Sequence, residues 1–173
     1  MDSETGNKKL RQQIESLRSS NRSAILATLD ELRSEGDVSI LPELFNLMLI
    51  EENEEVLHKI MTLLNDLKDN EAADILAEAI AKPEYLAIQT PLVAACWQNG
   101  LAYGKHIGIF ADVVVYGDYS AAIEAFTVIE EAVGELEPEE RTSLVRTLKS
   151  KRNTIKDQKQ ALLEELIKTI ESF

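Results

Sequence analysis

The chain of 173 residues is poor in cysteine, tryptophan and long apolar runs. Its single cysteine, Cys96, excludes an internal disulfide framework and any metal site built from several cysteines. No run of about 20 apolar residues occurs, so we expect no helix that spans a membrane. Residues 1–13 are polar and lack the apolar core of a signal peptide. These absences predict a cytoplasmic protein.

Basic residues are also scarce, with 18 Lys and Arg against 31 Asp and Glu and a formal net charge of −13. Residues 35–140 hold 22 of the acids and only four bases, whereas residues 141–173 hold eight bases and four acids. Such a middle repels phosphate groups, so we expect neither nucleic acid nor a membrane as partner. The charge has three interpretations: a solubilising surface, a surface that steers a basic partner, or an acidic body on which the basic tail docks, in cis or in a second copy.

Apolar residues recur at steps of three and four along most of the chain, as at Leu41, Leu44, Phe45 and Met48. This is the spacing of one helix face. The runs are about 10 to 15 residues long, and glycine, proline or asparagine stands between them, where helices commonly end or begin. The pattern predicts an all-α protein.

The helix junctions recur as well. Asn21, Asn53, Pro83 and Gly117 each mark the start of a second helix, at intervals of about 30 to 34 residues. A repeat of this length with two helices is typical of an α-solenoid, in which each hairpin covers the apolar face of the next. We therefore expect residues 1–136 to form an α-α superhelix of about four helical hairpins. The expected hairpins span about residues 7–36, 38–69, 70–100 and 103–136.

The last segment, residues 137–173, differs from the repeats. Apolar residues are spaced for a helix face around Leu144 and again from Leu162 to Ile170, while residues 149–160 are polar except for Ile155. We predict a helical cap on the array with an exposed, basic stretch. The sequence leaves open whether this cap is one long helix or two.

The second expected hairpin resembles a HEAT repeat of the armadillo-type superhelix family. Residues 40–45, which contain Pro42, resemble the proline-bearing first helix of such a repeat, and residues 56–67 resemble its second helix. The likeness covers roughly residues 7–136. The resemblance implies a protein-binding scaffold with no reaction attached, although a fold by itself carries function only weakly.

Trp97, the only tryptophan, is the first candidate for contact with a partner. On a helical wheel of the third hairpin's second helix, it shares a face with Leu86 and Val93, opposite the presumed core face. The repeat offsets align Trp97 with Asp66 and Glu131, which we expect to be exposed, but a shift of one residue aligns it with a core position. The sequence thus leaves open whether Trp97 is core or an exposed anchor, which would be a binding hot spot.

Five further residues complete the candidate partner-binding set. Tyr103 and Tyr116 fall at expected loop edges, where aromatic side chains can contact a ligand or partner. Acidic side chains on the expected second helices supply the charge for steering. These are Glu55, Asp66 and Glu131.

Catalytic and metal-binding motifs are missing from the sequence. There is no glycine-rich phosphate loop, nucleophile elbow or zinc motif. His58 and His106 fall on different helices, and Cys96 lies on a helix expected to be buried. We therefore expect no metal, no cofactor and no enzymatic activity.

Three functions follow from these observations. The first is a non-catalytic protein–protein interaction scaffold or adaptor with an acidic surface and an aromatic patch in the third and fourth repeats. The second is a homo-oligomeric structural module that uses the array end or the basic C-terminal helix. The third is a small-molecule binder or enzyme with a pocket between repeats three and four.

Overall fold

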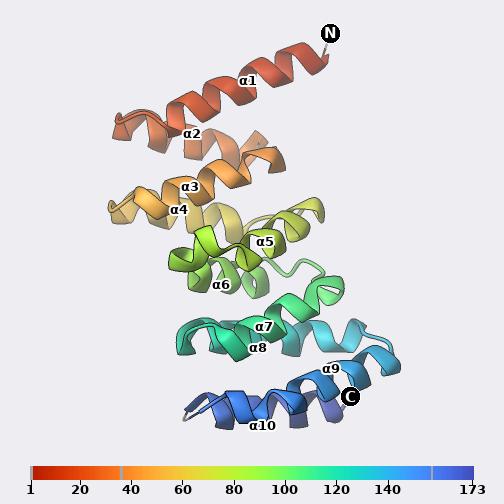
Figure 1. Ribbon diagram of the computed structural model, residues 1–173. Helices are drawn as coiled ribbons and strands as arrows, with labels where there is room; N and C mark the ends of the chain where they lie inside the picture. Colours follow the sequence, from red (N-terminus) through yellow and green to blue (C-terminus); the bar gives the residue numbers. More distant parts are fainter. Residues whose placement is uncertain (1, 36, 157) are drawn as a thin grey trace.

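The computed structural model in Figure 1 describes residues 2–35, 37–156 and 158–173. Every regular element in these residues is helical, so the all-α prediction is confirmed. The α-helices follow one another as five hairpins. In chain order they are α1 (Asp2–Leu17), α2 (Arg22–Glu35), α3 (Leu41–Ile50), α4 (Glu54–Asn65), α5 (Glu71–Ala81), α6 (Gln89–Asn99), α7 (Ile107–Tyr116), α8 (Tyr119–Ala132), α9 (Pro138–Ser150) and α10 (Gln158–Glu171).

Short 3-10 helices lie at several junctions. They are η1 (Val38–Ile40), η2 (Pro83–Ile88), η3 (Gly104–His106), η4 (Val133–Glu135) and η5 (Arg152–Thr154). None of the helices in the described part of the chain is both long enough and apolar enough to cross a membrane.

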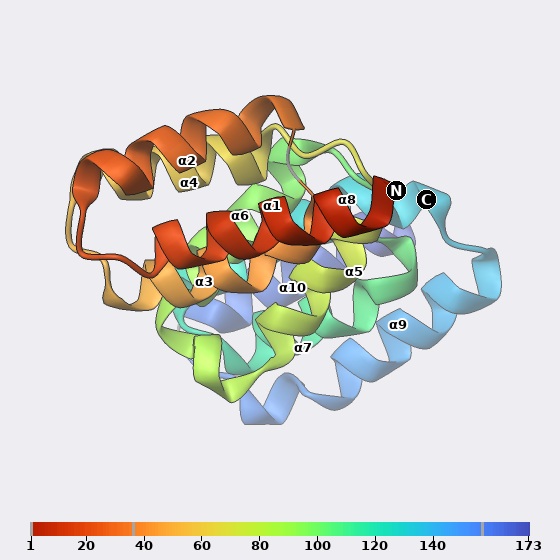
Figure 2. The ribbon, with the colours of Figure 1, turned by 90° about the horizontal axis from the view of Figure 1, so that it is seen from above.

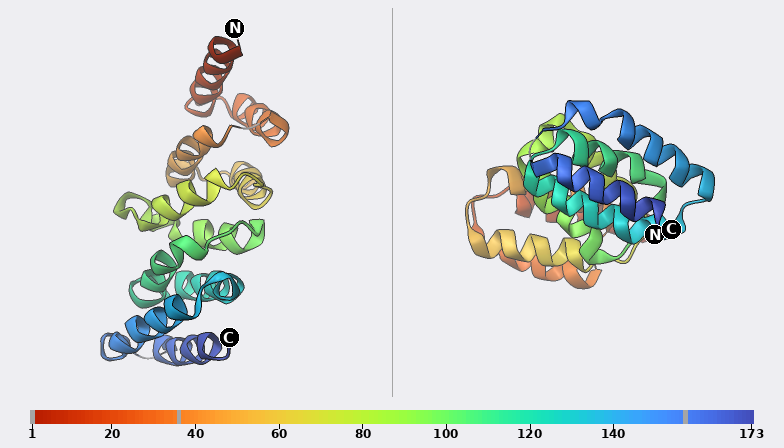
Figure 3. Two further views of the ribbon diagram at one scale, coloured as in Figure 1. Left: turned by 90° about the vertical axis from the view of Figure 1, so that its right-hand side faces the viewer. Right: turned by 90° about the horizontal axis from the view of Figure 1, so that it is seen from below.

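The hairpins stack one on the next, with α1 at one end of the molecule and α10 at the other (Figure 1). Their first helices form one layer and their second helices form another, as the left view of Figure 3 shows. Seen along the stack, α2 lies over α4, apart from α1 and α3 (Figure 2). Contacts join α2 to α4, α4 to α6, α6 to α8 and α8 to α10 in the second layer. This is the superhelical arrangement that the repeat predicts.

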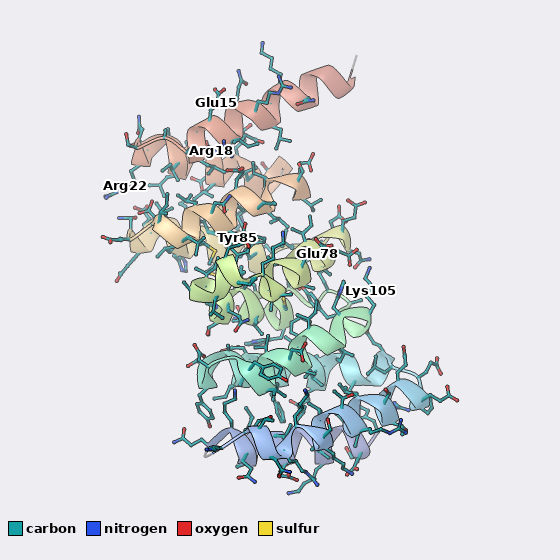
Figure 4. The ribbon with its side chains drawn as sticks, in the orientation of Figure 1. Glu15, Arg18, Arg22, Glu78, Tyr85 and Lys105 are labelled. Atoms are coloured by element: carbon teal, nitrogen blue, oxygen red, sulfur yellow. The ribbon has the colours of Figure 1, made fainter. Side chains whose placement is uncertain are left out.

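The core runs as a strip between the two layers, because each helix turns one apolar face inward. In α4, for example, Val56, Ile60 and Leu64 recur every four residues and have no exposed surface. Phe45 in α3 and Phe110 in α7 are the largest of the fully buried side chains among the described residues. A polar contact joins the first layer too, since Arg18, directly after α1 (Figure 4), donates from Nε to Glu43 Oε2 of α3 at 2.8 Å.

Three of the recurring junctions are N-caps of second helices. The side-chain oxygens of Asn21, Asn53 and Asp118 accept hydrogen bonds from the backbone N–H groups of the third residue on, at 3.2, 3.2 and 2.7 Å. Each satisfies a donor that the first turn of a helix leaves without a partner. The junctions that mark the repeat therefore have a direct physical role in starting α2, α4 and α8.

The third hairpin departs from the repeat, and the prediction that its second helix starts at Pro83 is wrong. Pro83 opens η2, and α6 begins only at Gln89. Tyr85, labelled in Figure 4, anchors η2 on α3 by donating from its hydroxyl to Asn46 Oδ1 at 3.2 Å. A 3-10 helix has 3.0 residues per turn, so a helical wheel drawn for an α-helix puts the side chains of this segment in the wrong directions. Leu86 consequently does not share a helix face with Trp97.

The tail forms a fifth hairpin of two helices, which answers the question left open by the sequence. In the connection between α9 and α10, Asn153, Thr154 and Lys156 are exposed, but Ile155 is buried and joins the core. Lys159 at the start of α10 donates from Nζ to the carbonyl oxygens of Val115 at 2.8 Å and Gly117 at 2.6 Å. The ammonium group thus caps the C-terminal end of α7.

Candidate interaction surface

The structure distributes the eight candidate residues over separate places. Trp97, Tyr103 and Glu131 meet at a pocket of about 120 Å³ between the C-terminal parts of α6 and α8. Leu86 and Tyr116 meet at a second pocket, of about 200 Å³, where η2 faces α7. Glu55 and Asp66 lie at the two ends of α4, and Val93 lies inside the core. We call the first of these the α6–α8 pocket.

Trp97 is 40% exposed, so it is a partly covered surface residue. Its indole Nε1–H donates to Glu124 Oε2 of α8 at 2.6 Å. This bond holds the ring across the junction of α6 and α8. Glu124 was missed by the sequence analysis, because it lies 27 residues further along and no repeat offset links the two positions.

Val93 and Tyr103 correct the prediction, since both are buried and neither is free to contact a partner. Val93 has no exposed surface because α6 is packed against α4, α5 and α8. Tyr103 is 2% exposed, with its ring 5.5 Å from Phe110 in an edge-to-face arrangement. Its hydroxyl lies 3.1 Å from Nδ2 of the buried Asn99, which draws the side chain inward from the loop.

The base of the α6–α8 pocket carries no charge. Cys96 is buried there, and burial raises the pKa of its thiol to about 12. Burial likewise raises the pKa of the Tyr103 hydroxyl, and proximity to Cys96 adds to this shift. Both groups are therefore protonated at neutral pH, and the thiol is a poor nucleophile.

The rim of the α6–α8 pocket is acidic. Glu131 in α8 and Glu135 in η4 both line it, and both are exposed. Among the described residues, neither carboxylate has an ion-pair partner. Two lysines of adjacent elements are engaged elsewhere: Lys105 Nζ lies 2.7 Å from Asp74 Oδ1, and Lys68 Nζ lies 3.4 Å from the carbonyl oxygen of Asn99. Glu135 could have been found from the sequence, because it follows Glu131 by four residues.

At the pocket of Leu86 and Tyr116, the tail contacts the Tyr116 ring. Both residues are 64% exposed, but the Nζ atom of Lys151 lies 5.6 Å from the centre of the Tyr116 ring. The hydrogen bond and attraction to Tyr116, followed by the charge of Asp112, raise the pKa of Lys151. The basic tail therefore contacts the acidic body in cis at this point, as it also does through Lys159.

The two acids of α4 differ in their surroundings. Glu55 is exposed in the first turn, beside Asn53. Asp66 follows the last turn and pairs with Arg33 Nη2 of α2 at 3.1 Å. Asp66 is thus partly neutralised within the molecule, whereas Glu55 has no ion-pair partner in the part of the chain that the structure describes.

The histidines do not assemble a metal site. His106 Nε2 lies 2.6 Å from Asp74 Oδ1, and His58 is exposed on α4. Within residues 2–35, 37–156 and 158–173, no group of three or more His, Cys, Asp or Glu side chains is placed to hold a metal ion.

Comparison with known proteins finds no protein-family model that matches the chain and no curated protein that matches it.

Proposed function

We propose that the protein is a non-catalytic, HEAT-like interaction scaffold that binds a basic segment of a partner protein on the second-helix surface of α6 and α8. The observation that carries this proposal is the acidic surplus left at the surface. Of the four bases in residues 35–140, Lys59 pairs with Asp30 and Lys105 pairs with Asp74, while Lys68 lies beside a backbone carbonyl. Most carboxylates of the same region stay open to solvent.

An acidic surface of this kind favours binding over chemistry. Exposed carboxylates are surrounded by water, whereas general acid–base pairs require environments that separate their pKa values. Association with a basic partner, by contrast, gains from long-range attraction, which raises the rate of encounter and weakens with added salt.

A homo-oligomeric module is supported less well. The exposed residues of the end helices α1 and α10 are almost entirely polar, for example Arg11 and Glu15 in α1 and Glu165 and Lys168 in α10. Such faces do not offer the apolar area that obligate interfaces bury. Several bases of the tail also have partners within the molecule, among them Lys149 with Glu171 and Arg152 with Glu164.

The experiment is a fluorescence-anisotropy titration with a labelled peptide rich in lysine and arginine, at low and high salt. We expect binding that weakens with salt, and no binding of an acidic peptide of equal length. The variant E130Q/E131Q/E135Q, which neutralises the α8 side, should bind the basic peptide about tenfold more weakly.

The matched control is E71Q/E78Q/E84Q, which removes the same charge from exposed positions of α5 and η2. This control should change the dissociation constant less than threefold, a shift of about 0.6 kcal/mol. Equal effects of the two triple variants, or no binding of the basic peptide, would contradict the proposal.

A further inference from the structure

We propose that the α6–α8 pocket receives one arginine side chain of the partner, stacked on Trp97 and paired with Glu131 and Glu135. This inference rests on the proposed function, because it specifies what the basic segment places in the pocket. It combines three observations on the same pocket: a fixed aromatic ring, two carboxylates that pair with no described residue, and an open side at Gly100.

The ring of Trp97 is already held in position. Because its Nε1–H donates to Glu124 Oε2 at 2.6 Å, little side-chain freedom is lost when a ligand binds. Tryptophan is also the aromatic side chain that attracts a cation most strongly, and arginine is the cation most often found over it. With 40% of its surface exposed, Trp97 can accept a planar group without displacing the core.

The two carboxylates supply the charge that a guanidinium group needs. Glu131 and Glu135 are four residues apart and both line the pocket, so one cation can lie near both. The residues that line the pocket include these two acids and no lysine or arginine. A guanidinium has five N–H donors in a fixed plane, and it can stack on a ring while it donates to carboxylates at the edge. A lysine ammonium cannot do both with the same geometry.

The pocket is accessible from the side of Gly100. Gly100 ends α6 in the left-handed region, at φ +66°, and a Cβ placed on it would meet no heavy atom within 4 Å. The pocket volume of about 120 Å³ suits the end of one long side chain rather than a larger ligand. At the base, Cys96 and Tyr103 are neutral, so they neither repel a cation nor compete for the carboxylates.

The test uses the fact that Trp97 is the only tryptophan, so its indole N–H gives a single NMR signal. The probe is a capped tetrapeptide with one arginine and three alanines. Two control peptides carry citrulline, which is close to arginine in shape but uncharged, or lysine. We expect the arginine peptide to shift the indole signal and the Gly100 amide signal saturably. The citrulline peptide should shift neither, and the lysine peptide should bind several-fold more weakly.

Matched variants assign the effect to the pocket. E131Q/E135Q should weaken binding of the arginine peptide about tenfold, since each exposed charge pair contributes up to roughly a factor of five. E71Q/E78Q, which removes two exposed acids of α5 outside the lining, should change binding less than twofold. Urea unfolding of each variant shows whether it folds as the parent protein does.

Three outcomes would overturn the inference: equal shifts with arginine and citrulline, tighter binding of lysine than of arginine, or equal effects of E71Q/E78Q and E131Q/E135Q. Each of these would leave the scaffold proposal standing if the longer basic peptide still responded to the α8 triple variant. Loss of that longer-range binding would instead remove the scaffold proposal itself, so the two failures can be told apart.

Discussion

At the scale of single residues, the buried side-chain amide of Asn99 makes hydrogen bonds to several parts of the fold at once. Asn99 is 4% exposed at the end of α6. Its Nδ2 donates to the carbonyl oxygen of Leu64 in α4 at 3.3 Å, and its Oδ1 accepts from the backbone N–H of Leu101 at 3.0 Å. With Tyr103, this one side chain joins two helices and the following loop beneath the α6–α8 pocket.

We predict that Asn99→Leu destabilises the protein by about 2–4 kcal/mol, because it leaves several buried polar groups without partners while keeping the volume similar. Urea unfolding followed by circular dichroism measures the loss. Tyr103→Phe is the control, since it removes only the hydroxyl and should cost about 1 kcal/mol. A smaller effect for N99L than for Y103F would contradict this account.

Residue-level prediction succeeded where the helical phase was continuous. Glu55, Asp66 and Glu131 were expected to be exposed, and they are. Val93 and Tyr103 were misplaced, because their burial depends on neighbours that a wheel does not contain: the helices on either side of α6, and the amide of Asn99. The hydrogen bond from Trp97 to Glu124 joins two helices, and no local sequence pattern predicts such a contact.

At the scale of elements, helix ends decide how consecutive hairpins join. Lys159 is the clearest case, because a residue of α10 caps the end of α7 in the preceding hairpin through two carbonyl oxygens. Burial lowers the pKa of this ammonium group, and the charge of Asp118 offsets part of the shift. A charged ammonium group at this position interacts favourably with the negative end of the helix dipole.

We predict that Lys159→Met lowers the free energy of unfolding by about 1–2 kcal/mol, because two carbonyl groups lose their donor and the dipole loses its cation. The matched control is Lys168→Met on the same helix, where the ammonium group is exposed and lies 3.5 Å from Glu165. That control should change stability by less than about 0.5 kcal/mol. Equal losses in thermal or urea unfolding would show that the cap has no special role.

The starts of helices could be predicted where the sequence contains an N-capping residue. Asn21 and Asn53 mark second-helix starts that the repeat already indicated, and Asp118 caps α8 one residue after the predicted Gly117. The prediction of a helix start at Pro83 was wrong, because proline also suits the first turn of a 3-10 helix. Tyr85 of this 3-10 helix, η2, packs on Phe45, and the sequence pattern does not predict that contact. Tertiary contacts decided that boundary.

At the scale of the whole molecule, the two end hairpins close the array with polar surfaces. Terminal repeats of solenoids need such faces, because an apolar end would continue to stack. The exposed residues of α1 and α10 are charged or polar with few exceptions. The alternation of apolar and polar faces was visible in the sequence, and so was the overall architecture, since a repeat of two helices leaves few other ways to bury them.

We predict that the protein is a monomer of 19.3 kDa across the micromolar range. Size-exclusion chromatography with light scattering measures this directly. A mass of two or more chains that persists at high salt would contradict it and would favour the oligomeric module. Dimers that dissociate when salt is added would instead indicate pairing between the basic tail of one copy and the acidic body of another.

Stacking of each hairpin on its immediate neighbours has a mechanical consequence. With α1 and α10 at opposite ends (Figure 1), a pull along the chain loads the hairpins in series. We expect an end hairpin to detach first and to release roughly 30 residues, while the inner hairpins stay folded. We therefore expect such an array to lengthen in steps of one hairpin under load, with its middle, where α6 and α8 lie, unfolding last.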